Sequence, residues 1–204
     1  MQTNTIRWAP LVCALCALTG CTALSGGRTI DGIDHMRVIT VSRELPFSAQ
    51  TVWDRVFMDF ASVATFHPRF VSSGFIEGSK ALEVGAKRYA FYDAEQTRGI
   101  HEEVVALSHA EKTITFRIVR ALDVPIDTEY TYAVSRLEEL GPERTRFRMD
   151  FTYRTDPAFM AHFAHGTIRE DLEAMAVGME HYLKTGEAVN PDNYDKIKGA
   201  YATP

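Results

Sequence analysis

The sequence predicts an α+β fold in which an antiparallel sheet of seven strands curves around a long C-terminal helix. Residues 69–155 consist of apolar runs of period two separated by short turns, which is typical of antiparallel strands. Residues 157–185 carry apolar side chains at helical spacing, which predicts one long amphipathic helix. A chain of 204 residues is long enough for a single domain with its own core. Its net charge of −5 and its lack of a basic cluster argue against nucleic-acid binding.

The N-terminal part of this domain is predicted to be one strand followed by a helical stretch. Residues 36–45 are rich in β-formers, and Ser48 after Pro46 is a suitable N-cap for the segment that follows. That segment repeats valine and phenylalanine at helical spacing. It is expected to end before Pro68, because the residue before a proline avoids the α region.

Six further strands complete the predicted sheet. They are expected at about 70–77, 86–93, 97–107, 112–120, 127–138 and 145–153. In the last of them, large apolar residues alternate with polar ones, so one face is predicted to be buried and the other wet. Gly141 and Pro142 mark the hairpin that precedes it.

The C-terminal helix is predicted to begin at Asp156, as N-cap before Pro157, and to end near Gly186. Its apolar stripe comprises Met160, Ala164, Ile168, Leu172, Met175, Met179 and Leu183. Gly166 and Gly178 lie inside the helix, where each is either a tolerated surface glycine or a point of close packing or bending. Residues 187–204 are expected to form an irregular tail.

The N-terminus carries the features of an export signal. The apolar run 8–18 follows Arg7 and is far shorter than the roughly 20 residues of a membrane span. The tetrad Leu18-Thr19-Gly20-Cys21 resembles the lipobox of bacterial lipoproteins, in which the cysteine is acylated and becomes the first mature residue. The alternative is a short buried helix that ends at a cysteine.

Residues 1–20 are therefore expected to be a lipoprotein signal peptide. Residues 21–35 would be the lipidated Cys21 and a Ser/Gly-rich tether, and residues 36–186 the folded domain. Several acyl chains on one residue give stable membrane anchoring. Thr22 favours sorting to the outer membrane, with the domain facing the periplasm. Loss of the two signal-peptide cysteines would leave no disulfide or cysteine-built zinc site.

Several short motifs and the order of the elements point to a known family. Val52-Trp53 lies in the first helical stretch, Val84-Gly85-Ala86 precedes Arg88, and Glu102 is followed by "EVVAL" and then "ITFRI". Together they resemble the polyketide cyclase/dehydrase and lipid-transport group of the START-like (SRPBCC) superfamily, which also holds the birch pollen allergen and the abscisic acid receptors. The resemblance spans about residues 36–184. It implies a helix-grip fold with a cavity for hydrophobic ligands between sheet and helix.

Strand parity predicts which side chains face this cavity. Ile114, Phe116 and Ile118 form the apolar face of one strand, and Tyr130, Tyr132 and Val134 are assigned to the inner face of the next. Within residues 100–107 either alternate set could face inward. Similarity to the abscisic acid receptors favours the set with Glu102, and it puts Arg88, Ala90 and Tyr92 inward. The predicted ligand-binding residues are Arg88, Tyr92, Glu102, Phe116, Ile118, Tyr130, Tyr132, Met149, Ala164, Ile168 and Leu172.

The polar candidates have two interpretations. Arg88 and Glu102 are costly to bury alone, so they either orient the polar head of an apolar ligand or form a structural pair that touches no ligand. A buried tyrosine likewise either offers its hydroxyl to a ligand or fills the core. His162 and His165 lie three apart beside the apolar stripe and are interpreted as a solvated pair, because a zinc site needs further ligands.

These observations predict a lipid-anchored periplasmic protein that binds, carries or presents a hydrophobic small molecule or lipid, with no need for a cofactor or metal. The first alternative is a cyclase/dehydrase-like enzyme in which Arg88, Glu102, His67 and Tyr130 perform acid/base work. The second is a protein-docking module, which would have a filled interior and an exposed apolar patch. No Gly-x-Ser-x-Gly elbow or glycine-rich phosphate loop indicates another chemistry.

Overall fold

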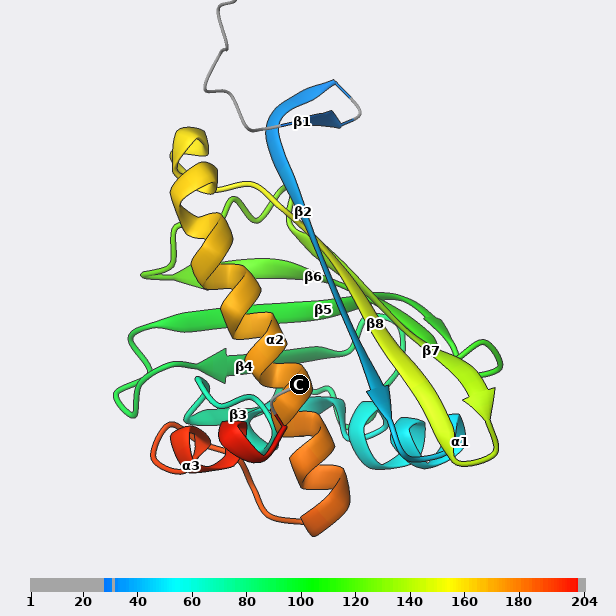
Figure 1. Ribbon diagram of the computed structural model, residues 1–204. Helices are drawn as coiled ribbons and strands as arrows, with labels where there is room; N and C mark the ends of the chain where they lie inside the picture. Colours follow the sequence, from blue (N-terminus) through cyan, green and yellow to red (C-terminus); the bar gives the residue numbers. More distant parts are fainter. Residues whose placement is uncertain (1–27, 31, 202–204) are drawn as a thin grey trace, which may run out of the picture.

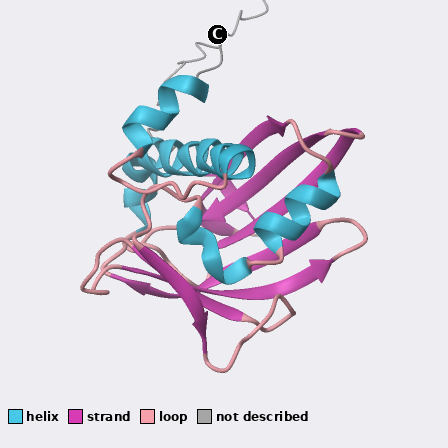
Figure 2. Cartoon of the chain, turned by 90° about the horizontal axis from the view of Figure 1, so that it is seen from below, coloured by secondary structure: helices cyan, strands magenta, loops and turns pink. Residues whose placement is uncertain are grey.

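The predicted fold class is confirmed by a computed structural model, which describes residues 28–30 and 32–201. Within these residues an antiparallel sheet of eight strands curves around the long helix α2, Ala161–Thr185 (Figure 1). Seen from below, the helical segments all lie on the concave side of the sheet (Figure 2). The predicted signal peptide and the lipobox with Cys21 lie outside the described residues. None of the described helices is long and apolar enough to cross a membrane.

The strands follow the order β1-β2-β8-β7-β6-β5-β4-β3 across the sheet. Their bounds are β1 Arg28–Ile30, β2 Ile33–Leu45, β3 Ser72–Ile76, β4 Lys87–Phe91, β5 Gly99–Ser108, β6 Thr113–Leu122, β7 Tyr132–Gly141 and β8 Arg144–Tyr153. The prediction of seven strands was wrong, because the backbone turns at Gly32 with φ of 81° and β1 pairs back onto β2. Residues 28–30 and 33–35, which were predicted to belong to a tether, are therefore strand residues of the sheet.

The predicted N-terminal helical stretch is divided into three short segments. They are α1 (Ala49–Val52), the π-helical η1 (Trp53–Phe57) and the 3-10 helix η2 (Phe60–Thr65). Ser48 caps α1 as expected, since its Oγ accepts a hydrogen bond from the Thr51 N–H at 3.1 Å. The three segments bury one face against the sheet, so tertiary packing and not a continuous helix holds them in place.

Helix α2 begins later than predicted. Pro157 has an extended backbone with ψ of 149°, so a short 3-10 helix η3 (Ala158–Met160) intervenes, and Met160 and not Asp156 occupies the N-cap. The helix ends as predicted at Gly186, which adopts the left-handed conformation with φ of 74°. Residues 174–183 are largely buried in the core, whereas the first half of the helix is more exposed.

The two helical glycines differ in their surroundings. A Cβ atom at Gly178 would lie 2.2 Å from the carbonyl oxygen of Phe66, so only glycine lets the helix approach the end of η2 this closely. At Gly166 a Cβ atom would meet nothing within 4 Å. Gly178 is thus the predicted point of close packing, and Gly166 is a surface glycine.

The segment after α2 is not the irregular tail that was predicted. Val189 is fully buried, and its N–H donates to the Thr65 carbonyl at 2.9 Å. Helix α3 (Tyr194–Lys198) and the 3-10 turn η4 (Gly199–Tyr201) follow, with Ile197 buried beneath them. The segment was predicted to be irregular because most of its residues are polar. Its two buried apolar residues, Val189 and Ile197, pack it against the domain.

Substitution of the two glycines should have opposite effects on stability. Gly178→Ala forces the helix away from Phe66 and should lower the free energy of unfolding by about 1–3 kcal/mol. Gly166→Ala, the matched control, should raise it by up to about 1 kcal/mol through helix propensity. Urea unfolding of both variants measures this difference. Equal effects of the two substitutions would contradict the close packing at Gly178.

Candidate ligand cavity

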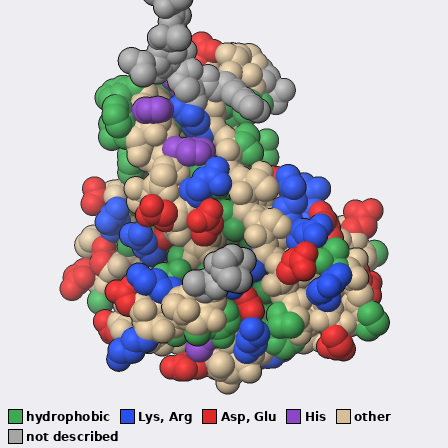
Figure 3. Space-filling view, viewed as in Figure 1, with side chains coloured by type: hydrophobic (Ala, Val, Ile, Leu, Met, Phe, Trp, Pro, Cys, Tyr) green, Lys and Arg blue, Asp and Glu red, His purple; other side chains and the backbone are tan. Residues whose placement is uncertain are grey.

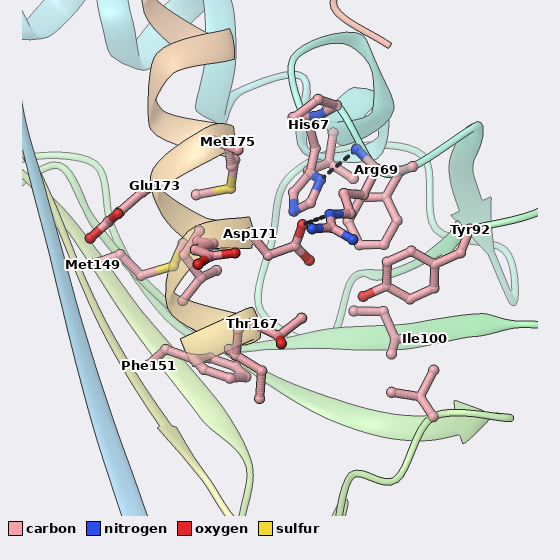
Figure 4. Close-up of a pocket in the computed structure, with 18 of the residues that line it drawn as sticks. His67, Arg69, Tyr92, Ile100, Met149, Phe151, Thr167, Asp171, Glu173 and Met175 are labelled. Carbon is pink, nitrogen blue, oxygen red and sulfur yellow. Dashed lines mark hydrogen bonds and ion pairs between the residues drawn. The ribbon is translucent and has the colours of Figure 1, made fainter. Parts of the chain in front are cut away.

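A cavity of about 1320 Å³ lies between the sheet and helix α2. Its floor comes from the inner faces of β4 to β8, and its roof is the face of α2 that carries Ala164, Ile168 and Leu172. The loop 67–70, the connection 124–126 and the C-terminal segment 191–201 complete the walls. The volume is larger than the roughly 300–1,000 Å³ of most small-molecule sites, and most of the lining side chains are apolar (Figure 4).

Nine of the eleven predicted ligand-binding residues line this cavity. They are Arg88, Tyr92, Glu102, Phe116, Ile118, Met149, Ala164, Ile168 and Leu172. The inner faces of β5 and β6 follow the predicted parity as far as Val104, after which a bulge in β5 turns Ala106 outward. Contact of these residues with a ligand stays a prediction.

The parity assigned to β7 was wrong. Phe116 of β6 pairs with Ala133, so Ala133, Ser135 and Leu137 face inward while Tyr132 is 38% exposed on the outer face. Tyr130 lies outside the cavity lining, where Arg154 stacks over its ring at 5.4 Å. The prediction followed the size of the two tyrosines, which have more apolar surface than their neighbours. The cavity instead has the small side chain of Ala133 on its wall, where a larger one would fill the space.

Arg88 and Glu102 form a buried ion pair. Arg88 Nε donates to Glu102 Oε2 at 2.6 Å across the neighbouring strands β4 and β5. Arg88 Nη1 donates to the Phe60 carbonyl at 2.6 Å, and the guanidinium lies 4.0 Å from the centroid of the Phe60 ring. Between the two alternatives for these residues, the geometry therefore favours the structural pair, whose partners are supplied by the protein itself.

A second polar cluster lies where α2 faces the loop 67–70. Asp171 comes from α2, His67 and Arg69 from the loop, and Tyr92 from the end of β4. The Asp171 carboxylate, the His67 ring and the Tyr92 hydroxyl point toward one another (Figure 4). Arg69 Nε lies 2.7 Å from Asp171 Oδ1, so the two side chains form an ion pair.

The three titratable groups of this cluster are shifted in different directions. Burial, together with the positive charges of Arg88 and Arg69, lowers the pKa of His67 to about 3. Burial raises the pKa of Asp171 to about 6, although Arg69 opposes that change. Burial and the nearby Asp171 and Glu102 also raise the pKa of the Tyr92 hydroxyl well above its usual range. At neutral pH, His67 and Tyr92 are neutral, and only Asp171 titrates near physiological pH.

The orientation of His67 follows from its backbone contact. The Arg69 N–H donates to His67 Nδ1 at 3.3 Å, so Nδ1 carries no proton and the neutral ring carries its proton on Nε2. His67 was predicted as an acid/base candidate, and it does line the cavity. A group whose pKa is this low binds hydrogen-bond acceptors through Nε2–H and does not act as a strong base.

Asp171 and Arg69 were missed by the sequence reasoning. The available signal was the position of Asp171, three residues after Ile168 and four before Met175, which places a carboxylate within the apolar stripe of the helix. Arg69 had no such signal, because its role depends on how the loop folds back against α2.

His162 is exposed, as expected of a solvated residue, whereas His165 is partly buried. His162 Nδ1 lies 3.2 Å from Arg37 Nη2, and His165 Nδ1 lies 3.3 Å from the Tyr153 hydroxyl. Within residues 28–30 and 32–201, no three histidine, cysteine or acidic side chains come together as metal ligands.

Removal of one partner of the Arg88–Glu102 pair should destabilise the fold. Arg88→Met leaves Glu102 as an uncompensated buried charge and should cost about 3–5 kcal/mol, whereas Arg88→Met combined with Glu102→Leu should recover much of that loss. The control is Arg117→Met, which breaks the exposed pair with Glu103 on the outer face of β5 and β6 and should change little. Chemical unfolding of the wild type and the three variants tests this. A single variant as stable as the control would contradict the argument.

Comparisons with known proteins agree with this fold. The similar solved structures include norcoclaurine synthase from Thalictrum flavum in complex with dopamine and hydroxybenzaldehyde, with a TM-score of 0.57 and 14% identity over 75% of this chain and 89% of that one. Zhui aromatase/cyclase from Streptomyces sp. R1128 has a TM-score of 0.55 and 16% identity over 76% of this chain and 100% of that one. A protein from Bacillus thuringiensis has a TM-score of 0.54 and 19% identity over 72% of this chain and 99% of that one. At these identities the likeness shows a shared fold.

The family follows from the sequence match. No curated protein matches the chain significantly. Residues 36–180, however, match the family model described as polyketide cyclase / dehydrase and lipid transport. This match supports a function in hydrophobic-ligand binding or in cyclase-type chemistry. The chain belongs to the polyketide cyclase/dehydrase and lipid-transport family.

Proposed function

We propose that the protein is a membrane-anchored carrier that holds a hydrophobic small molecule or lipid in the cavity between the sheet and α2. The observation that carries the proposal is the cavity itself, which is about 1320 Å³ in volume and lined mostly by apolar side chains. Space of this kind costs packing energy, and burial of an apolar ligand offsets that cost. The membrane anchor is the acylated Cys21 predicted from the lipobox.

The arrangement of polar groups indicates which kind of ligand fits. Arg88 and Glu102 are bonded to each other deep in the cavity, and the apolar body of a ligand can lie beside them against Phe116 and Ile118. Polar groups that can meet the head of a ligand come together at Asp171, His67 and Tyr92. The ligand is therefore expected to be apolar over most of its length, with one hydroxyl, carbonyl or similar head at this cluster.

Anchoring and carrying are physically compatible. A poorly soluble ligand partitions into the bilayer, and a protein tethered to the same bilayer meets it at a high effective concentration. An acylated chain that loses residues 1–20 would carry this domain in the periplasm, at the outer membrane.

The carrier proposal predicts a co-purifying ligand that a cavity-filling substitution expels. The full chain, isolated in detergent from a host that processes lipoproteins, should release a stoichiometric apolar molecule on solvent extraction followed by mass spectrometry. Ile168→Trp should weaken the affinity at least roughly tenfold, which corresponds to a steric cost of about 1.4 kcal/mol, and the amount of co-purifying ligand should fall. Arg169→Trp is the matched control, since Arg169 is exposed on the same turn and does not line the cavity. Equal occupancy in the two variants would argue against this cavity as the binding site.

A cyclase-type enzyme is the second candidate, and Asp171 is the observation that favours it. With a pKa of about 6, this carboxyl can both donate and accept a proton near neutral pH, beside two groups that stay neutral. Zhui is an aromatase/cyclase of the same fold, which makes this chemistry compatible with the architecture. Asp171→Asn would then abolish conversion of the extracted ligand while leaving its binding largely intact.

The titration of Asp171 can be tested without a ligand. Its pKa rises from 3.8 to about 6 on folding, so its stabilising contribution is complete below about pH 4 and is lost as the pH rises through 6. His67 has the opposite sign: its pKa falls from 6.5 to about 3, so its contribution is complete above about pH 6.5 and is lost as the pH falls.

Thermal unfolding between pH 4 and 7 should reveal these opposing slopes. Relative to Asp171→Asn, the wild-type chain should lose stability as the pH rises from about 4 to 6. Relative to His67→Gln, it should gain stability as the pH rises from about 4 to 6.5. Melting curves of Asp171→Asn that run parallel to the wild type over this range would show that Asp171 does not titrate there.

A further inference from the structure

Two phenylalanines at the start of α2 are exposed to solvent. Phe159 is 60% and Phe163 is 70% exposed, and they lie four residues apart, in η3 and in the first turn of α2. In the space-filling view, hydrophobic side chains gather over this end of the helix with histidines beside them (Figure 3). Large aromatic side chains carry much apolar surface, so a neighbouring pair of this kind marks a contact surface.

The same end of the molecule is one rim of the cavity. Val124 and Pro125, in the connection between β6 and β7, line the cavity and are at least partly exposed. Pro125 lies next to the start of α2, because its carbonyl accepts from the Asp156 N–H at 3.2 Å. On the helix, Ala164 lines the cavity directly after Phe163. We name Val124, Pro125, Phe159 and Phe163 the apolar tip.

The described chain also begins at this end. Arg37 of β2 contacts His162 in the first turn of α2, and Met36 next to it pairs with Arg28 of β1 (Figure 1). From Cys21 to Arg28 there are seven residues, which span at most about 25 Å when fully extended. A lipid anchor on Cys21 would therefore keep the apolar tip within reach of the bilayer surface.

From this geometry we propose that the apolar tip inserts into the interface of the lipid bilayer that holds the anchor, so that the rim of the cavity faces the membrane. The inference rests on the proposed carrier function and adds the orientation of the protein and the route of the ligand. A hydrophobic ligand would pass between the bilayer and the cavity along the start of α2, without crossing water.

Apolar burial and not charge is the expected driving force. Arg37, His162 and His165 lie beside the apolar tip, but Asp123, Asp127 and Asp156 lie on the neighbouring connections, so the local charge is mixed. Uncharged bilayers of phosphatidylcholine should therefore be sufficient. In an interfacial contact of this kind, phenylalanine side chains lie at the boundary of headgroups and acyl chains.

Fluorescence of an introduced tryptophan tests the insertion in the full chain. Phe163→Trp is reconstituted into phosphatidylcholine vesicles, with plain or brominated acyl chains, and the wild-type emission is subtracted. The emission should shift to shorter wavelength and lose intensity in brominated lipid. Val84→Trp is the matched control, because Val84 is 61% exposed in the loop before β4, and its emission should not change.

The outcomes separate this proposal from the anchor and from other occupants. If Phe163→Trp behaves like Val84→Trp, the proposal is overturned. It is also overturned if the emission shifts without lipid in proportion to protein concentration, since a second copy would then cover the tip. The intact mass reports acylation of Cys21 independently. An unacylated chain with quenched Phe163→Trp leaves insertion standing and the anchor refuted, and an acylated chain without quenching does the reverse.

Discussion

The buried guanidinium of Arg88 is the contact on which the site depends. It is hydrogen-bonded to Glu102 on the adjacent strand and to the carbonyl of Phe60 in η2, so it connects the sheet to the helical segment above it. A buried charge needs such partners, and the hydrogen bond to Phe60 fixes the position of η2 over the sheet. The loop 67–70 continues from η2 and forms one wall of the cavity. The charge of Arg88 also contributes to keeping His67 neutral.

The cavity exists because the two halves of α2 are packed differently. In the second half, Gly178 allows the helix to touch the backbone at Phe66, and the helix is held in the core. In the first half, the inner face of the sheet offers small side chains such as Ala133, and the helix stands above open space. The packed second half of the helix holds the first half away from the sheet. Without it, the helix and sheet would close on each other and fill the space, as in a densely packed interior.

The polar groups of the cavity form two separate clusters. Arg88 and Glu102 are bonded to each other and to the Phe60 carbonyl, whereas Asp171, His67 and Tyr92 point toward one another beside the loop 67–70. Only one of the three, Asp171, changes its charge near neutral pH. The cavity thus combines a mostly apolar lining with one carboxyl group that can gain or lose a proton near neutral pH. This combination suits an apolar molecule with a polar head, and it permits simple proton transfer.

The sequence by itself determined the fold class, the inner face of β6 and the end of α2, because apolar periodicity and caps such as Ser48 and Gly186 are local properties of the chain. The inner faces of β4 and β5 were assigned from the resemblance to the abscisic acid receptors. Of the nine cavity residues that were predicted, Arg88, Tyr92 and Glu102 came from that resemblance and the others from apolar patterning. Only the tertiary structure decided that Tyr132 faces outward, that Val189 binds the C-terminal segment to the domain, and that Arg69 meets Asp171. These outcomes depend on strand register and on contacts between residues distant in sequence, and neither leaves a periodic signal in the chain.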